Sequence, residues 1–394
     1  MLPHIRNIIK INHKDMPPKF TLTSAPNTIE QANDLLKDFK FHFGKTYNTD
    51  EAAKMAAVNL GNAAQRVMML NTKSAKAGSS VQFEINEYSD MSPTEFKQKM
   101  LTYKPPPIQA APIGPKLRQS SQSVPNSRDW STIPGAVTPA RSQGTCGSCW
   151  AWAAAGVLEG ANYIQNGVSE PLSPEAISSC TDTGISNGCD GGTAYDAFEF
   201  AKKGVPREVD YPYTSANRSY GTGRGVCLRE KLKPFVRVTD VKQTTPNDEL
   251  SLKDAVAMQP VYVAMDGMKI YEYKGGIMPS SVGCEDANHA VLAVGYGTDE
   301  NGTKYWKFKN SWGDNWGENG YFRLERTDST NTTGTLCMVK YPSFYVKVAN
   351  EAPKPVDPNP NPKPVDPNPS PSPVQTLKPF QIVYTCTALH PGNV

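Results

Sequence analysis

The sequence lacks the features that would place it in several common classes of protein. Its 394 residues contain no run of about 18 apolar residues, so nothing in it predicts a transmembrane helix. The formal net charge is only +3, which is too small to favour binding to nucleic acid or to a membrane surface. The first twenty residues make a poor secretory signal, because Arg6 and Lys10 interrupt their only apolar stretch.

Histidine is also scarce, and this limits the metal sites that the chain can build. Only one of the five histidines, His289, lies in the part of the chain that carries the tryptophans. Cys146 and Cys149 form a closely spaced pair, but no second pair of Cys or His accompanies them, which disfavours a zinc site. We expect no metal and no cofactor.

Composition divides the chain into three regions. Residues 1–123 begin with two stretches at helical spacing, about 28–43 and 51–70, and end in a proline-rich connector at 104–123. Residues 124–350 read as a globular domain with all six Trp and seven of the eight Cys. In residues 351–394, the segment PKPVDPNP occurs twice, which predicts an extended linker and tail.

The segment QGTCGSCWAW raises three interpretations of its two cysteines. They could form a redox pair of the thioredoxin kind, half of a metal site, or a structural cysteine beside a nucleophile. Cys149 stands where a helix should begin, and a helix N-terminus favours thiolate over thiol. The helix predicted from Cys149 has Val157 and Ile164 on one face and ends at Asn166-Gly167.

A nucleophilic cysteine needs a base, a group that orients the base, and donors for an oxyanion. His289 opens the predicted strand HAVLAVGYG, and Asn301-Gly302 predicts a hairpin to the next strand. On that strand Asn310 shares the inward face with two aromatic residues. Gln143 lies six residues before Cys149, where its amide could point at the same place as the Cys149 backbone N–H.

The motifs QGTCGSCWAW, GCDGG, NHAVLAVGYG and KNSWGDNWGENGYF, in this order, resemble the papain family of cysteine proteases, and the cathepsin L-like branch in particular. The resemblance covers about residues 124–347. It implies an α+β fold with a helical half and a β-barrel-like half, with the active-site cleft between them. It also implies that Cys149 is the nucleophile and His289 its base, that Asn310 orients the imidazole, and that Gln143 completes the oxyanion hole.

The same resemblance implies three disulfides, and these decide between the interpretations of the two cysteines. The pairs are Cys146–Cys189, Cys180–Cys227 and Cys284–Cys337. Cys149 then remains a free thiol, and Cys386 is left over in the tail. Disulfides favour an oxidising or lysosomal compartment, so we expect a lysosomal or secreted protein. A truncated or mispredicted start of the sequence would account for the poor secretory signal.

For substrates, the resemblance implies an endopeptidase that takes a bulky hydrophobic residue two positions before the cleaved bond. Trp312 resembles the ring that shields the His–Asn hydrogen bond, and Pro342 falls at the floor of the specificity pocket. The expected substrate-binding residues are Gly191, Gly192, Thr193, Ala194, Ala264, Ala287, Asn288, Ala290, Trp312 and Pro342. Protein and peptide substrates are the expected partners of a monomeric enzyme.

Residues 1–123 resemble an inhibitory pro-segment, so the chain is expected to be a zymogen that is cleaved in the connector. Asn86, Tyr88 and Asp90 match a short motif of such segments, whereas a longer helical motif counted from Glu51 is degraded. We expect acid to release the pro-segment by neutralising carboxylates such as Asp90. The alternative to an enzyme is a catalytically silent papain-like binding protein.

Overall fold

The computed structural model describes Phe20, Leu22 and residues 24–105, 111–115, 124–218 and 221–350. The proline-rich repeat and Cys386 lie outside these residues. Within them, no helix has the length and hydropathy needed to cross a bilayer. The fold is of the mixed α+β class that the motifs imply, with three helices before the globular domain and separate helical and β-rich parts inside it.

The first region forms three helices, α1 (Ile29–Phe43), α2 (Asp50–Lys76) and α3 (Pro93–Met100). Each is capped by a hydroxyl, because the side chains of Thr28, Thr49 and Ser92 accept backbone N–H groups from the first turns. Helix α1 packs on α2 through the apolar face that its sequence predicts. Its first residue, Ile29, is the exception, since it is 50% exposed.

The helical motif counted from Glu51 is only partly buried on α2, since its Asn59 is 8% exposed and donates to the carbonyl of Asp90 at 3.0 Å. Met55 is 60% exposed, and Glu51 and Asn62 are also exposed. The face that is buried instead carries Ala56, Leu60, Ala63 and Val67. The reason is that α2 has apolar residues on nearly every side, so that spacing alone does not select one face.

The helical half of the globular domain contains α4 (Cys149–Asn166), α5 (Pro174–Cys180) and α6 (Ala194–Ala201). Residues 149–162 of α4 are buried on all sides, because other helices cover one flank and the sheet covers the other. The predicted stop is confirmed, since Gly167 adopts a φ of 70° and ends the helix. Ile164 is 43% exposed and therefore does not belong to the core face that was predicted for it.

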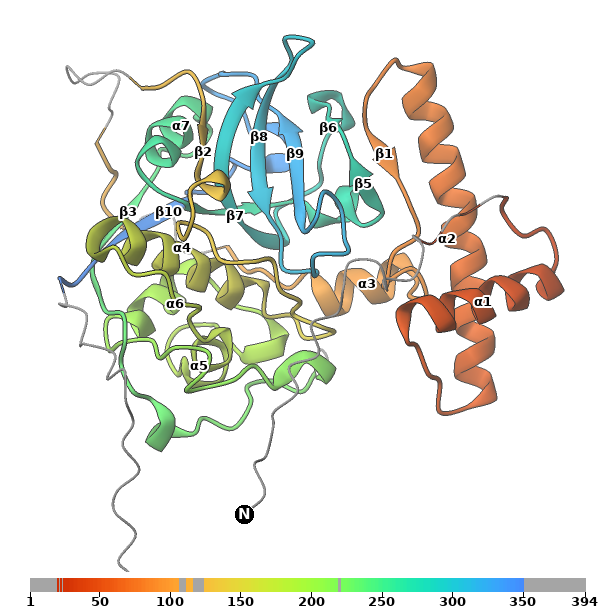
Figure 1. Cartoon of the computed structure of the whole chain (residues 1–394), viewed down its shortest axis with the longest axis horizontal. Coiled ribbons are helices and arrows are strands. Elements are labelled where there is room, and N and C mark those ends of the chain that lie inside the picture. Colours follow the sequence, from red (N-terminus) through yellow and green to blue (C-terminus); the bar gives the residue numbers. More distant parts are fainter. Residues whose placement is uncertain are drawn as a thin grey trace, which may run out of the picture. The chain divides into compact units, whose positions relative to one another are not determined.

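The β-rich half is an eight-stranded sheet with the helix α7 (Glu249–Met258) packed against β7. Along the main path the order is β3-β10-β4-β7-β8-β9-β6, and β2 also pairs with β7. The strands are β2 (Arg128–Asp129), β3 (Val238–Gln243), β4 (Val261–Met265), β6 (Ile277–Met278), β7 (His289–Thr298), β8 (Lys304–Lys309), β9 (Tyr321–Glu325) and β10 (Phe344–Val348). The two strands predicted from sequence are β7 and β8, and Figure 1 shows them side by side with β9.

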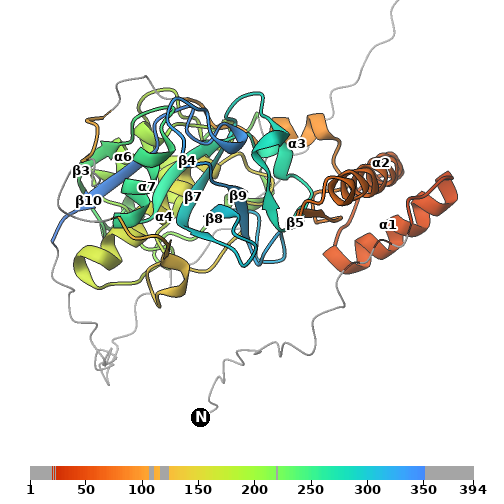
Figure 2. The ribbon, with the colours of Figure 1, turned by 90° about the horizontal axis from the view of Figure 1, so that it is seen from above.

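A second, two-stranded sheet joins the first region to the globular domain. Strand β1 (Gln82–Phe83) pairs antiparallel with β5 (Tyr273–Gly275). The side chain of Asn71 on α2 exchanges two hydrogen bonds of 2.9 Å with the backbone of Phe83 and so holds β1 on α2. Figures 1 and 2 both show α2 and β1 beside β5.

Candidate active site

Cys149 is the first residue of α4 and is completely buried. The loop before it contains glycines that no other residue could replace at the same backbone conformation. A Cβ on Gly144, whose φ is +62°, would lie 2.0 Å from the Ala216 carbonyl oxygen, and one on Gly147 would lie 2.4 Å from the Cys189 carbonyl oxygen. This packing holds Cys149 at the N-terminal end of the helix, where the dipole favours a thiolate.

The structure joins the other six cysteines of the globular domain into Cys146–Cys189, Cys180–Cys227 and Cys284–Cys337. These are the pairs that the resemblance implies. The first ties the loop before Cys149 to the segment that precedes α6, and the third fixes the loop before His289. Among the described residues Cys149 is then the free cysteine.

His289 begins β7, and its ring is fixed by two contacts. Nε2 lies 2.8 Å from Oδ1 of Asn310, and the ring stacks on Trp312 with centroids 4.7 Å apart. All three side chains are buried, with Asn310 the most exposed at 3%. Because Asn310 accepts at Nε2, the proton of a neutral imidazole is placed there and Nδ1 is free to act as a base.

Gln143 is fully buried and close to Asn310 in the fold. Its Oε1 accepts a hydrogen bond of 2.6 Å from the hydroxyl of Ser311, and its Nε2 donates to the carbonyl of Cys146 at 2.8 Å. An amide nitrogen carries two hydrogens, so this contact leaves one N–H for a ligand at the Cys149 end of the helix.

The Cys149 thiol lies among backbone groups from both the globular domain and the first region. Backbone groups of Ala290 and Thr102 hydrogen-bond to it and favour its thiolate, but burial is the larger effect and raises the pKa of Cys149 from 9.0 to about 11. Burial likewise lowers the pKa of His289 from 6.5 to about 4, against a smaller opposing effect of Asn310. Both groups are therefore neutral at pH 7 in this structure.

The first region passes over Cys149 in extended form. The N–H of Tyr103 donates to the carbonyl of Asn288 at 3.0 Å, the N–H of Lys104 donates to that of Gly192 at 3.0 Å, and the hydroxyl of Thr102 donates to that of Gly147 at 2.6 Å. A Cβ on Gly191 would lie 1.8 Å from the Thr102 carbonyl oxygen. The backbones of Gly147 and Gly192 thus accept hydrogen bonds from the first region, and Gly191 lets the Thr102 carbonyl approach closely.

The ring of Tyr103 is buried in a hydrophobic cluster that contains four of the ten expected substrate-binding residues. The cluster includes Ala194, Ala264, Ala287 and Ala290. Thr193 is also buried and caps α6, while the Asn288 side chain bonds to Asp266 and to the backbone of Gly267. Pro342 is buried, and its place in the pocket stays a prediction.

The sequence did not predict two tyrosines that lie in this hydrophobic cluster, Tyr103 and Tyr262. Tyr103 follows α3 and precedes the proline-rich connector, so nothing local indicates that its ring enters a pocket. Tyr262 lies on β4 on the same face as Ala264, and its ring centroid is 6.2 Å from that of Tyr103. The period of two in β4 was a signal that could have identified Tyr262.

An aromatic cluster extends from the first region to Trp312, which stacks on His289. Phe96 on α3 stacks on Tyr271 at 3.9 Å and meets Trp312 edge-on at 5.2 Å. Tyr88 also reaches Trp312, at 6.1 Å, and the amide of Asn86 donates to the carbonyl of Tyr271 at 2.7 Å. The first region therefore packs directly on the ring that covers the His289–Asn310 hydrogen bond.

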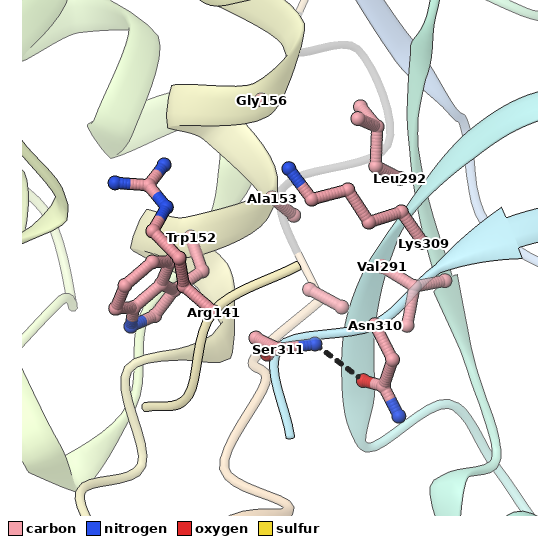
Figure 3. Close-up of a pocket in the computed structure, with 10 residues that line it drawn as sticks. Arg141, Trp152, Ala153, Gly156, Val291, Leu292, Lys309, Asn310 and Ser311 are labelled. Atoms are coloured by element: carbon pink, nitrogen blue, oxygen red, sulfur yellow. Dashed lines mark hydrogen bonds between the residues drawn. The ribbon is translucent and has the colours of Figure 1, made fainter. Parts of the chain in front are cut away.

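Lys309 is the last residue of β8, directly before Asn310, and anchors this strand to the helical half. Figure 3 shows its side chain extending beside Ala153 of α4, while Asn310 points to the opposite side of the strand. Its Nζ donates to the hydroxyl of Thr138 at 2.9 Å, and burial lowers the pKa of Lys309 to about 8. Thr138 in turn donates to Glu159 of α4 at 2.6 Å, so one buried chain of contacts links the strand of Asn310 to the helix of Cys149.

Comparisons with known proteins agree with this geometry. Residues 124–344 match the family described as papain family cysteine protease. A rice protein named Cysteine protease 1 is 38% identical over 267 residues, which is 66% of this chain. Mouse Cathepsin J is 36% identical over 321 residues, covering 78% of this chain and 91% of the mouse protein. The match spans only 53% of the length of the rice relative.

Solved structures extend the similarity to the first region. A recombinant stem bromelain precursor covers 80% of this chain and 98% of its own, with 31% identity and a TM-score of 0.69. The digestive procathepsin L 3 of Tenebrio molitor covers 80% and 99%, with 29% identity and a TM-score of 0.70. The first of these proteins is named as a precursor and the second as a procathepsin.

Proposed function

Because the chain belongs to the papain family of cysteine proteases, we propose that it is a cysteine endopeptidase that is held as a zymogen by its own first region. The observation that supports the proposal is a free thiol at a helix N-terminus that contacts the backbone of Ala290, the residue after a histidine whose ring is bonded to an amide and stacked on an indole. Cys149, His289, Asn310 and Trp312 supply these parts.

The chemistry begins when the first region leaves the cleft. The Cys149 proton passes to Nδ1 of His289, which produces a thiolate and an imidazolium. The sulfur attacks the carbonyl carbon of the scissile peptide bond, and the carbonyl oxygen becomes an oxyanion. The Cys149 backbone N–H and the remaining N–H of Gln143 donate to this oxygen.

Collapse of this intermediate breaks the C–N bond, and His289 returns its proton to the leaving amine. The product is a thioester on Cys149. A water molecule then gives a proton to His289 and attacks the thioester, which releases the carboxylic acid product and restores the thiol. Asn310 and Trp312 hold the imidazole in one orientation through both proton transfers.

For specificity, we propose a pocket for a bulky hydrophobic side chain two positions before the cleaved bond. The walls formed by Ala194, Ala264, Ala287 and Ala290 are small, and an aromatic ring, that of Tyr103, is accommodated there in the zymogen. A pocket of this kind discriminates between hydrophobic side chains by only about 1–3 kcal/mol, so we expect broad cleavage.

For organisation, we propose a pro-segment at residues 1–123, a catalytic domain at 124–350 and a linker and tail at 351–394. Cleavage should fall between residues 104 and 123, of which only 104–105 and 111–115 are described. This connector is less free than a proline-rich sequence suggests, since Gln243 exchanges backbone hydrogen bonds with Pro112 and Gly114. A monomer that acts on protein substrates in a lysosomal or secreted location completes the proposal.

The alternative, a silent binding protein, separates cleanly from an enzyme in one experiment. The full chain is acidified until its pro-segment is removed, and the pro-segment of the Cys149→Ser variant is cleaved off with an added protease. Both proteins are then assayed on peptides with Leu, Phe or Gly two positions before the bond. We expect turnover of the Leu and Phe peptides by the wild type alone. Equal turnover by the Cys149→Ser variant, or none by either protein, would overturn the proposal.

A further inference from the structure

A cavity of about 400 Å³ lies where the first region meets the catalytic domain, away from Cys149. Its walls come from the C-terminal half of α2 and from β1 on one side. On the other side they come from the segments 268–272 and 278–282 that flank β5. The volume is within the range of sites for small organic molecules, which is about 300–1,000 Å³.

The walls of the cavity are mostly apolar. The apolar side chains are contributed by both parts of the chain: Leu70, Val81, Phe83, Met268, Met278 and Val282. Val81, Phe83 and Met278 are buried, whereas Val282 is 38% exposed. The cavity therefore has a hydrophobic interior that can be reached from solvent, and an apolar ligand chain would gain free energy by entering it.

The charges around the cavity are unbalanced. Arg66 and Glu272 both line it, and they form a hydrogen-bonded ion pair at 2.5 Å that neutralises both charges. Lys73 from α2 and Lys269 from the catalytic domain also line it, and neither makes an ion pair within the described residues. Two lysines that form no ion pair within the described residues, the exposed Lys73 and the half-buried Lys269, therefore lie at the wall of one largely apolar cavity.

We propose that this cavity is a binding site for a single-chain anionic amphiphile, such as a fatty-acid carboxylate. The alkyl chain would pack among the apolar side chains, and the carboxylate would lie between the ammonium groups of Lys73 and Lys269. A cationic amphiphile should bind poorly to this site, because its head group would be repelled by two like charges. A neutral amphiphile should bind more weakly than an anionic one, because it lacks the attraction to the lysines.

The position of the site gives the ligand an effect on activation. One lysine and half of the apolar wall belong to the first region, so that the complete site exists only while this region is docked. By mass action, a ligand that binds the docked form alone slows release of the pro-segment, about a hundredfold at a concentration a hundred times its Kd. The binding site stands without the proposed protease activity, whereas this effect on activation rests on it.

The test uses the full chain with Cys149→Ser, which folds as the zymogen and cannot process itself. Dodecanoate, below its critical micelle concentration, is titrated by calorimetry, with methyl dodecanoate and dodecyltrimethylammonium as neutral and cationic probes. The double variant Lys73→Glu/Lys269→Glu is compared with Lys54→Glu/Lys76→Glu, which makes the same change of net charge at exposed lysines of α2 outside the cavity.

We expect dodecanoate to bind the Cys149→Ser chain at least about tenfold more tightly than either other probe. The Lys73→Glu/Lys269→Glu variant should lose at least about tenfold in affinity, and the control pair should lose none. Absence of dodecanoate binding, equal binding of the methyl ester, or equal losses in both double variants would overturn the site.

Activation is measured separately on the wild-type chain. Dodecanoate should slow the appearance of the mature form, should fail to slow it in the Lys73→Glu/Lys269→Glu variant, and should not bind the processed enzyme. Unchanged activation despite binding would overturn the proposed effect. A chain that never processes would instead contradict the protease activity, while the binding measured on Cys149→Ser would stand.

Discussion

Removal of the pro-segment should change the pH dependence of Cys149 alkylation. In the zymogen, burial raises the pKa of the thiol from 9.0 to about 11, which reduces the thiolate at neutral pH about a hundredfold. After removal, the thiol remains at the N-terminus of α4 and gains access to an imidazolium at His289. Cysteines in such settings have pKa values of about 3.5–7.5.

The assay is alkylation by iodoacetamide at a series of pH values, followed by mass spectrometry of the peptide that contains Cys149. A Cys386→Ser background removes the one cysteine of the sequence that lies outside the described residues. The midpoint of each rate profile, rather than the absolute rate, reports the pKa, because steric protection lowers the rate at every pH alike. A zymogen midpoint at or below that of the processed enzyme would refute the reasoning.

The remaining predictions concern the pro-segment and the catalytic amide. Tyr103→Ala removes a ring that is buried in the same hydrophobic cluster as Ala264 and Ala290, so inhibition by the isolated pro-segment should weaken by about 2–4 kcal/mol, measured as its inhibition constant. An unchanged constant would show that the ring contributes nothing. Asn310→Ala should lower kcat about ten- to a hundredfold at nearly constant KM, because it frees the imidazole without touching substrate; a rise in KM alone would contradict this role. In the docked state burial raises the pKa of Glu272, and the opposing effect of Arg66 is smaller, so docking of the pro-segment becomes more stable as the pH falls through that raised pKa. In Glu272→Gln the affinity of the pro-segment should no longer rise on acidification, and a pH profile identical to that of the wild type would refute this.

The direction in which burial shifts the pKa of interface carboxylates limits how acid can activate the zymogen. Glu272 and Glu87 both line the interface, and burial raises the pKa of each, so that protonation of either favours the docked form. Release of the pro-segment by acid must overcome the stabilisation of the docked form by both protonated carboxyls. Asp90 accepts hydrogen bonds from Tyr47 at 2.9 Å and Lys45 at 3.4 Å inside the first region, and loss of these contacts on protonation remains the hypothesis for acid release.

The catalytic dyad does not supply a trigger of this kind near neutral pH. In the zymogen one proton resides on Cys149 and none on Nδ1 of His289, and in the open enzyme the same proton resides on the imidazole. The number of bound protons is then equal in the two states. Release of the pro-segment moves a proton within the dyad, and acid acts elsewhere.

The parts of the site that sequence could predict are those carried by local patterns. Cys149 at a helix start, His289 at a strand start and Asn310 on an inward strand face each follow from residues close by in the chain. That these three residues belong to one site does not follow from local patterns, and only the resemblance to a family predicted it. The hairpin at Gly302, with a φ of 82°, is predicted for the same local reason.

The parts that sequence could not predict depend on contacts between distant segments. The buried face of α2 could not be predicted because alanine and methionine occur on several faces of that helix, and only packing on α1 and β1 selects the face with Leu60 and Val67. Tyr103 and Phe96 reach rings far along the chain, at Tyr262 and Tyr271, and no periodicity encodes such a pairing.

The central claim is that one thiol, Cys149, carries all the turnover once the pro-segment has left. The most direct test is to titrate the processed enzyme with an epoxysuccinyl inhibitor while following hydrolysis of a peptide substrate, and to locate the label by mass spectrometry. The account predicts one equivalent bound to Cys149 at the point where turnover reaches zero. Turnover that persists in the fully labelled protein, or a label on another residue, would contradict it.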